Sequence, residues 1–272
     1  MSNECNHDCG SCQEDCEERS FLAPMNAHSH IKKVIGIVSG KGGVGKSSIT
    51  SLLAVLKQRE GNQVAVLDGD ITGPSIAKTF GVEGTQIYSN GQEIIPAVSL
   101  NGTKIMSTNL LLENAEDPVV WRGPILAGMI KQFWTDVKWG DVDYMFVDMP
   151  PGTGDVPLTI FQSLPLDGII IVTSPQELVS MIVGKAVNMA KQMNIPILGI
   201  VENMSYVECP DCGKKIFVFG KSHLEDVAKK FDLNILGQVP LDSQLTQLSD
   251  MGMIENYSSD WLDQFEEKVK EF

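Results

Sequence analysis

The segment that most constrains this chain is GKGGVGKS, residues 40–47, which matches the phosphate-loop pattern G-x-x-x-x-G-K-[ST] at every specified position. Such a loop needs glycines so that its backbone N–H groups can face an anion, a lysine for the outer phosphates and a hydroxyl for magnesium. The specified positions hold Gly40, Gly45, Lys46 and Ser47. Residues 33–39 are typical of a buried strand and 47–58 of a helix, so the motif stands in the strand–loop–helix context that it requires.

The rest of the chain alternates short runs rich in valine and isoleucine with segments of helical periodicity. This pattern predicts an α/β fold with a mostly parallel sheet and helices on both faces, as in a P-loop NTPase. The expected strands are 33–39, 63–68, 104–107, 143–148, 168–173, 195–202 and 235–239. The expected helices, besides 47–58, are 123–134, 178–193 and 222–231. We assign residues 31–272 to one P-loop domain and residues 1–30 to a short cysteine-rich N-terminal arm, with 24–30 as its linker.

The charge of the chain limits its partners. A formal net charge of −14 argues against binding to nucleic acid or to anionic membranes, because both need basic surface. No apolar run approaches the roughly 18 to 20 residues of a membrane-spanning helix, and the first residues lack the features of a secretory signal, so we expect a cytoplasmic protein. The amphipathic stretch 261–272 is acidic and is expected to pack on the domain as a helix rather than to anchor the chain in a membrane.

Three aspartates stand at strand ends, where a phosphate-loop enzyme needs acids. Asp68 ends the second predicted strand, Asp70 follows it, and Asp148 closes the fourth. Ligands in open α/β sheets gather at the carboxyl ends of the strands, so these side chains are expected near bound phosphates. Asp148 is expected to help hold Mg²⁺, with a helix N-cap as the alternative role. The glycine-rich turn at 151–154 is expected to lie near the γ-phosphate as a switch segment.

Lys41, directly after the first glycine of the loop, is not specified by the general phosphate-loop pattern. With it, the motif KGGxGK[ST] resembles the deviant Walker A motif of the MinD, ParA, nitrogenase iron protein and Mrp families. The resemblance implies that Lys41 reaches the nucleotide across a dimer interface, where a second cation stabilises charge on the transferring phosphoryl group. A solvated loop lysine is the alternative. The active form implied is a homodimer.

The same resemblance implies roles for individual residues. The catalytic residues that it implies are Lys41, Lys46 and Asp70. The magnesium ligands that it implies are Ser47, Asp68 and Asp148. Asp70 is expected to orient the attacking water, and Asn203, in VENMSY, is similar to the asparagine that reads the adenine edge; either residue could instead cap a turn. The residues expected to bind ATP or ADP are Gly40, Lys41, Gly42, Gly43, Val44, Gly45, Lys46, Ser47, Ser48 and Asn203.

All six cysteines fall into two clusters, and none is left for the core. The first cluster consists of Cys5, Cys9, Cys12 and Cys16. In a reducing compartment four cysteines so close together favour metal ligands over disulfides, and both an iron–sulfur cluster and a zinc ion suit four thiolates. Cys209 and Cys212, in CPDCG, supply only two ligands, whereas a closed site takes four. A two-fold dimer would provide a second pair, and a half zinc knuckle is the alternative.

Five segments resemble the Mrp/Nbp-type iron–sulfur cluster carrier ATPases. They are GKGGVGKSS (40–48), DGDITGPS (68–75), WRGP (121–124), DYMFVDMPPGTGD (143–155) and VENMSYVECPDCG (201–213). The resemblance implies a homodimeric ATPase that hydrolyses ATP slowly, holds a labile [4Fe-4S] cluster between Cys209 and Cys212 of both subunits, and transfers it to apo iron–sulfur proteins. The arm departs from the family pattern, because eukaryotic relatives space their N-terminal cysteines more widely. The alternatives are an ATP-gated electron donor like the nitrogenase iron protein, and a MinD- or ParA-like positioning ATPase with zinc-bound cysteines.

Overall fold

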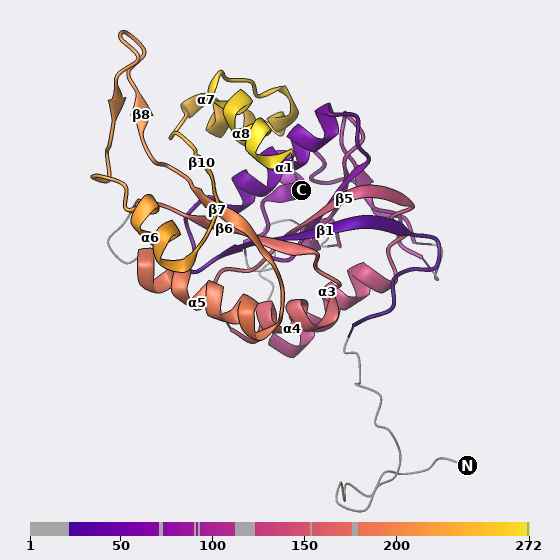
Figure 1. The fold of residues 1–272 in the computed structure, drawn as a ribbon. Coiled ribbons are helices and arrows are strands. Elements are labelled where there is room, and N and C mark those ends of the chain that lie inside the picture. The colour runs from indigo at the N-terminus through magenta and orange to yellow at the C-terminus, as the bar shows by residue number, and fades with distance from the viewer. Residues whose placement is uncertain are drawn as a thin grey trace, which may run out of the picture.

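The computed structural model describes residues 22–70, 73–89, 91, 93–111, 123–152, 154–175, 179–270 and 272. The four cysteines of the N-terminal arm lie outside these residues, as do Trp121 and Arg122 of the WRGP segment. The described part of the chain forms a central sheet with helices on both faces, and a hairpin projects from one end of the sheet (Figure 1).

The sheet has eight strands within the described residues, in the order β10-β7-β6-β1-β5-β2-β4-β3. Every neighbouring pair is parallel except β3 and β4, which are antiparallel at one edge. The strands are β1 (His30–Ser39), β2 (Val64–Asp68), β3 (Ala97–Val98), β4 (Lys104–Met106), β5 (Asp141–Asp148), β6 (Gly168–Thr173), β7 (Ile197–Glu202) and β10 (Ile235–Gln238). A separate antiparallel hairpin pairs β8 (Val207–Glu208) with β9 (Lys215–Ile216).

Helices cover both faces of this sheet (Figure 1). One face carries α3 (Gly123–Thr135), α4 (Asp155–Ser163), α5 (Val179–Gln192) and α6 (Leu224–Phe231). The other face carries α1 (Lys46–Arg59), α2 (Ile76–Thr79), α7 (Ser243–Asp250) and α8 (Trp261–Val269). Two short 3₁₀ turns are η1 (Thr108–Leu111) and η2 (Ile254–Asn256).

The side chains of β1 show why the sheet is covered on both sides. Val34 and Val38 join the apolar core beneath α3, α4 and α5, whereas Ile35 and Ile37 join the core beneath α1 and α8. Each of the four is at most 3% exposed. A strand that is buried on both faces reads as a continuous apolar run, which is the pattern that predicted this strand.

The mostly parallel sheet and the P-loop fold are confirmed. Every predicted strand and helix is present, and its boundaries differ from the prediction by three residues or fewer. Among the described residues, the elements that the sequence did not predict are α2, α4, α7, β3, β8, β9 and the turns η1 and η2. Most of these are too short to show a period, because α2 spans four residues and β3 spans two. Helix α4 carries Pro157 in its first turn, where proline is tolerated but reads as a break in the sequence.

The start of the described chain differs from the expected linker at 24–30. The backbone N–H of Ala23 donates to the carbonyl of Ser163 (2.8 Å), and Trp134 Nε1 donates to the carbonyl of Ala23 (3.1 Å). Met25 packs on the core, and β1 already begins at His30. This segment therefore runs along the body, because its apolar side chains find partners there.

Helix α8 packs on the domain, as its sequence predicted. Leu262, Phe265 and Val269 form its inner face, and each is at most 4% exposed. Among the described residues, no helix combines the length and the apolar character needed to cross a bilayer.

Candidate functional site

The phosphate loop connects the carboxyl end of β1 to the start of α1, and packing fixes its first and last glycines. A Cβ atom on Gly40 would lie 1.9 Å from Cγ2 of Ile182, on α5. Gly45 has a φ of +74°, and a Cβ atom there would lie 2.1 Å from Nδ2 of Asn203. Only glycine combines the left-handed backbone of Gly45 with this close approach. The loop is therefore seated between α5 and the end of β7.

Asp148 is the centre of a buried polar network beneath the loop. Its Oδ1 accepts hydrogen bonds from Lys46 Nζ (2.7 Å) and Thr50 Oγ1 (2.7 Å), and its Oδ2 accepts one from Ser47 Oγ (2.6 Å). Asp148 is fully buried, so these contacts compensate for the loss of its hydration. The network brings together the predicted residues Lys46, Ser47 and Asp148 at the carboxyl edge of the sheet.

Asp68 and Asp70 occupy different environments. Asp68 is fully buried, and its carboxyl accepts hydrogen bonds from the N–H groups of Asp70 and Ile76 and from Ser107 Oγ. Burial, together with the neighbouring Asp148 carboxylate, raises the pKa of Asp68 to about 8. Asp70 lies nearer the loop, with Oδ2 at 3.9 Å from Lys46 Nζ. Asp68 thus shapes the backbone that carries Asp70, and its predicted role as a magnesium ligand stays a prediction.

A cavity of 270 Å³ opens over the phosphate loop. Its walls are residues 42–48 of the loop, Asp70, Gly73, Ser75 and Pro151, and the end of β1. The glycine-rich turn after β5 is attached here, because the N–H of Gly152 donates to the carbonyl of Ser39 (2.8 Å). Loop N–H groups at the start of a helix and a buried ammonium group are the donors that bind phosphate. The cavity is therefore a candidate nucleotide site that includes the predicted Asp70.

The oxygen atoms around this cavity fit a magnesium ion bound with a nucleotide. The Ser47 hydroxyl and the Asp70 side chain line the cavity, and the Asp148 carboxylate is hydrogen-bonded to Ser47. Mg²⁺ prefers hard oxygen ligands of this kind and usually shares them with phosphates and water. Ser47 and Asp148 are therefore the side chains best placed to hold it, directly or through water.

Lys41 is partly exposed at the rim of the loop, and its carbonyl accepts a hydrogen bond from Ser39 Oγ (3.0 Å). Within the described part of the chain, no carboxylate lies within ion-pair distance of its ammonium group. Ser48, the next residue beyond the phosphate-loop pattern, lines the cavity. The role of Lys41 across a dimer interface stays a prediction.

Asn203 contacts the phosphate loop itself. Its Nδ2 donates to the carbonyl of Val44 (2.9 Å), and its backbone N–H donates to the carbonyl of Thr173, at the end of β6 (2.8 Å). Asn203 is buried between the loop and the sheet. Its contact with adenine stays a prediction, and what the structure shows is a direct link between the end of β7 and the loop.

Cys209 and Cys212 lie at the turn of a projecting segment, residues 206–221, that we call the cysteine hairpin. The carbonyl of Cys209 accepts a hydrogen bond from the N–H of Gly213 (2.9 Å), whose φ is +67°. Cys209 is partly exposed and Cys212 is exposed. The backbone N–H of Asp211 and then the Cys212 side chain lower the pKa of the Cys209 thiol. A lowered pKa favours the thiolate, which is the form that binds metals.

The cysteine pair is incomplete as a metal site within one subunit. In the described ranges, no three His, Cys, Asp or Glu side chains gather closely enough to hold a metal ion. The arm cysteines at positions 5, 9, 12 and 16 lie outside these ranges. Cys209 and Cys212 therefore remain two ligands short of a closed four-ligand site.

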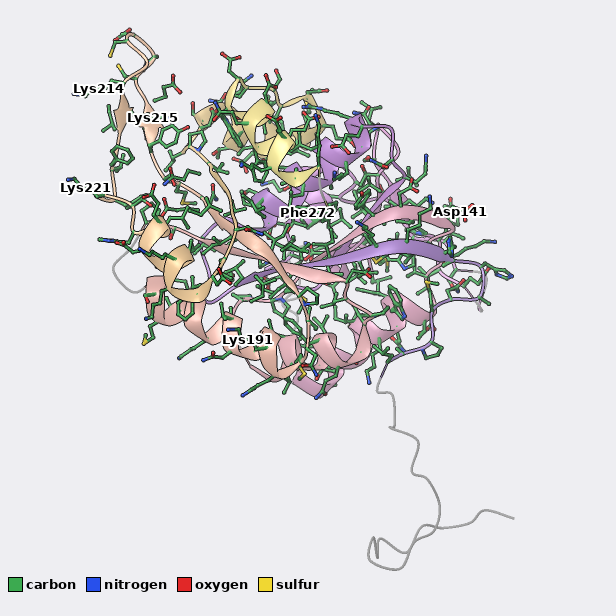
Figure 2. The ribbon with its side chains drawn as sticks, in the orientation of Figure 1. Asp141, Lys191, Lys214, Lys215, Lys221 and Phe272 are labelled. Carbon is green, nitrogen blue, oxygen red and sulfur yellow. The ribbon has the colours of Figure 1, made fainter. Side chains whose placement is uncertain are left out.

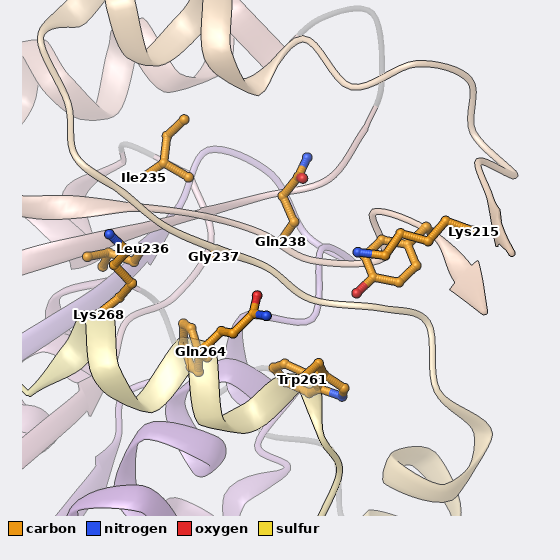
Figure 3. A pocket seen from close by; sticks show the side chains of 10 residues that line it. Lys215, Ile235, Leu236, Gly237, Gln238, Trp261, Gln264 and Lys268 are labelled. Atoms are coloured by element: carbon orange, nitrogen blue, oxygen red, sulfur yellow. The ribbon is translucent and has the colours of Figure 1, made fainter. Parts of the chain in front are cut away.

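The cysteine hairpin stands away from the domain. A cavity of 660 Å³ separates Cys209 from the start of α8, and a second cavity of 240 Å³ lies beside it, with Trp261 lining both. Figure 3 shows the second cavity, where Lys215 of the hairpin lies 4.0 Å from the ring centroid of Tyr206. Figure 2 shows Lys214 and Lys215 on the hairpin, at one side of the molecule. The hairpin is thus connected to the body mainly at its base.

Sequence reasoning missed two residues of this region. Thr50 bonds Asp148, and its place one turn after Lys46 on the same face of α1 is a signal that could have found it. Glu202 is a fully buried acid that closes the otherwise apolar strand β7. An acid at the end of an apolar strand, next to Asn203, is the corresponding signal.

Comparison with known proteins gives closely similar relatives. The iron-sulfur cluster carrier protein of Methanocaldococcus jannaschii is 46% identical over 259 residues, which are 92% of this chain and 89% of the relative. The protein of the same name from Clostridium perfringens is 43% identical over 258 residues, which are 92% of this chain and 90% of the relative. These relatives match almost the whole chain rather than the phosphate loop alone.

Solved structures agree with this comparison. A nucleotide-binding protein from Archaeoglobus fulgidus, solved in complex with ADP, is 42% identical with a TM-score of 0.77, over 86% of this chain and 92% of that chain. The cell division ATPase MinD of Pyrococcus furiosus has a TM-score of 0.62 at 18% identity, over 88% of this chain and 99% of that chain. At that identity the likeness shows the fold alone.

The family model that matches is that of the ParA-type NUBPL iron-transfer P-loop NTPases, and it covers residues 30–271. The match spans the sheet, the phosphate loop and the cysteine hairpin together. It confirms the resemblance to iron–sulfur cluster carriers that the sequence motifs indicated. The chain belongs to the family of NUBPL iron-transfer P-loop NTPases.

Proposed function

We propose that this protein is a cytoplasmic, homodimeric carrier that binds ATP, hydrolyses it slowly and transfers a labile [4Fe-4S] cluster to apo iron–sulfur proteins. The observation that carries the proposal is the pair Cys209 and Cys212, presented on a projecting hairpin in a chain of an iron-transfer family. A cargo that must be released needs ligands that a recipient can reach. Exposed thiols meet this need, whereas buried thiols would retain the cluster.

A two-fold dimer completes the cluster site. The pair supplies two thiolates, and the same hairpin of a second subunit supplies two more if the symmetry axis passes beside the turn. The relatives named iron-sulfur cluster carrier protein support this assignment of the cargo. The four cysteines of the arm provide a second set of ligands, for a cluster or for zinc.

The nucleotide acts as the control in this proposal. Residues 40–48 cradle the phosphates, Ser47 and Asp148 hold Mg²⁺, and Asp70 orients the attacking water. Lys41 of the partner subunit adds positive charge at the transferring phosphoryl group. Binding and slow hydrolysis change how the two subunits approach each other, and this changes how tightly the two cysteine pairs grip the cluster.

Metal analysis tests the cargo. The full chain is purified anaerobically, and its iron, sulfide and zinc contents are measured with visible and EPR spectra. The variant Cys209→Ala with Cys212→Ala is expected to lose the iron and sulfide of one cluster per dimer. A variant with serine at positions 5, 9, 12 and 16 is the matched control, because it removes only the arm ligands. Zinc without sulfide in the wild type would overturn the carrier function.

Nucleotide titration tests the separation of the two sites. Lys46→Ala is expected to abolish ATP binding, because it removes the ammonium group that faces the cavity. Cys209→Ala is expected to bind ATP as the wild type does, since the hairpin lies outside the nucleotide cavity. Normal ATP binding by Lys46→Ala would contradict the assignment of the loop.

A further inference from the structure

Glu202 is a buried acid whose partners lie at both ends of the cysteine hairpin. Its Oε2 accepts hydrogen bonds from Ser205 Oγ (2.5 Å) and Gln238 Nε2 (3.1 Å), and its Oε1 accepts one from Ser222 Oγ (2.9 Å). Ser205 is the residue immediately before the hairpin, and Ser222 is the residue immediately after it. One carboxyl group therefore fastens the two ends of the hairpin to the end of β7.

This fastening is specific to the base of the hairpin. Glu202 is fully buried, and among the described residues no Lys, Arg or His lies within ion-pair distance of it. A buried carboxyl without a cation depends on all of its hydrogen bonds, because each lost bond leaves a desolvated oxygen. The side chain therefore cannot shift alone, and a displacement of Glu202 carries Ser205 and Ser222 with it.

The next residue in the chain joins the same point to the nucleotide loop. Asn203 Nδ2 donates to the carbonyl of Val44, and the loop approaches so closely that Gly45 has no room for a Cβ atom. A change in the loop that moves Val44 thus acts directly on Asn203. Since Asn203 and Glu202 are consecutive, the displacement reaches the carboxyl that holds the hairpin through one peptide unit.

Beyond its base, the hairpin has little other support from the body. The cavities of 240 and 660 Å³ lie between it and α8. Figure 3 shows Gln238, a partner of Glu202, and Lys215 of the hairpin with the smaller cavity beside them. The direction in which the hairpin projects is therefore set at its base rather than by packing along its length. Backbone bonds from the N–H of Ser205 to the carbonyl of Val239 and from the N–H of Leu241 to the carbonyl of Tyr206 hold the first end, and Glu202 is the side chain that joins both ends.

We propose that Glu202 is the positioning residue that couples the nucleotide loop to the cysteine hairpin within each subunit. It transmits loop displacement, through Asn203, to both ends of the hairpin and so sets the placement of Cys209 and Cys212. This inference rests on the proposed function, because it supplies the internal path for nucleotide control of cluster binding. Glu202 touches neither nucleotide nor cluster in this role.

The test measures the reactivity of the cysteine pair without any cluster. Full-length, reduced and cluster-free protein is treated with iodoacetamide in the presence of ADP or of a non-hydrolysable ATP analogue. Alkylation rates at Cys209 and Cys212 are read peptide by peptide by mass spectrometry, so that the arm cysteines do not interfere. In the wild type the two nucleotides are expected to give rates that differ by about fivefold or more, as ordinary coupling between sites does.

Glu202→Gln is expected to reduce this ratio to about twofold or less, while the affinity for nucleotide stays unchanged. Glu255→Gln is the matched control, because Glu255 is also a buried acid that accepts bonds from Ser99 Oγ (2.6 Å) and from the N–H of Asn101 (3.2 Å). It joins η2 to the loop between β3 and β4 and is not bonded to the hairpin. This control is expected to keep the wild-type ratio.

Ser222→Ala keeps the test decisive if Glu202→Gln fails to fold. It removes the bond from Ser222 Oγ to Glu202 Oε1 and the bond that Ser222 Oγ accepts from the N–H of Leu224, and it leaves the other two bonds of Glu202 in place. It is expected to lower the ratio in the same direction. A wild type that responds to nucleotide, with Glu202→Gln or Ser222→Ala responding equally, overturns the inference alone. A wild type whose alkylation rates are the same with both nucleotides overturns both the inference and nucleotide control of the cysteine pair. The metal analysis then tests the carrier function separately.

Discussion

The phosphate loop and the cysteine hairpin both leave the carboxyl edge of the sheet, but the structure holds them in opposite ways. The loop is seated against α5 and the end of β7, with Lys46 and Asp148 buried beneath it. The hairpin is fastened at its base and leaves Cys212 exposed, with cavities between it and α8. A site that stabilises charge on phosphate profits from fixed donors, whereas a site that hands over cargo must be reachable.

The same substitution at two glycines gives the largest expected contrast. Gly45 and Gly213 both have positive φ, +74° and +67°. Gly45→Ala is expected to lower the free energy of unfolding by about 3 kcal/mol, because the new methyl meets Asn203 Nδ2 and backbone strain adds to the clash. Gly213→Ala is expected to cost about 1 kcal/mol, from strain alone. Urea unfolding followed by circular dichroism measures both, and equal losses would show that the loop is no more tightly packed than the hairpin.

Two threonines test the buried network itself. Thr50 and Thr79 each donate to a carbonyl four residues earlier, but only Thr50 also donates to Asp148. Thr50→Val is expected to lower the free energy of unfolding by about 2 kcal/mol, since it leaves the buried Asp148 with one donor fewer. Thr79→Val, measured in the same way, is expected to cost less than about 1 kcal/mol. Similar losses in the free energy of unfolding for the two variants would show that Asp148 is not the centre of the network.

Replacing the cysteine pair should barely affect folding. Cys209→Ser with Cys212→Ser is expected to change the free energy of unfolding by less than about 0.5 kcal/mol, because both side chains lie at an exposed turn. Chemical unfolding of cluster-free protein checks this, with Thr50→Val as the control for sensitivity. A loss as large as that of Thr50→Val would mean that the turn belongs to the cooperative core.

The smallest expected effect comes from comparing two aspartates of β5, Asp143 and Asp148. Asp143 is partly exposed, and a hydrogen bond from Lys32 Nζ (2.6 Å), followed by one from the N–H of Gln63, lowers its pKa. Because the folded pKa is lowered, the contact contributes stability above the unfolded pKa and loses it as the pH falls through the folded pKa. Lys32→Gln should raise the pKa of Asp143 toward its ordinary value in an NMR titration. The acid unfolding midpoint should rise only slightly, since exposed pairs contribute little.

That pKa should respond to Lys32 without any change in ATP affinity. Asp148, at the buried end of the same strand, contacts Lys46, Ser47 and Thr50 instead. An Asp143 pKa that stays unchanged in Lys32→Gln would mean that the backbone N–H of Gln63 alone holds it low.

The sequence predicted the nucleotide half of the molecule better than the hairpin. Its alternating apolar runs specify a buried parallel sheet, and GKGGVGKS specifies a loop at a known place on that sheet. Neither pattern predicts side-chain contacts between distant parts of the chain. The hydrogen bond from Asn203 to Val44 joins residues far apart in the sequence, so the periodicity of neighbouring residues does not predict it. The same holds for Ala23 against Trp134, where a segment without periodicity is held by contacts with distant helices.

The segment CPDCG predicted a pair of metal ligands, but it did not predict that the pair lies on a projecting hairpin. Short strands such as β8 and β9 carry too few residues for a period, so the hairpin and its cavities were beyond sequence reasoning. Glu202 was missed for a related reason, because two of its partners are distant in the chain. Gln238 reaches it only when β7 and β10 lie side by side, and Ser222 reaches it only when the hairpin returns to the body.

The way in which the hairpin is fastened has a consequence for how such proteins diversify. Residues 206–221 enter and leave the domain at one point, between two serines that share a single carboxyl. A segment attached in this way can be lengthened, shortened or exchanged for another ligand set without altering the sheet or the phosphate loop. The nucleotide-binding domain can therefore be combined with a different ligand set. The segment between Ser205 and Ser222 is the place where such a set would be inserted.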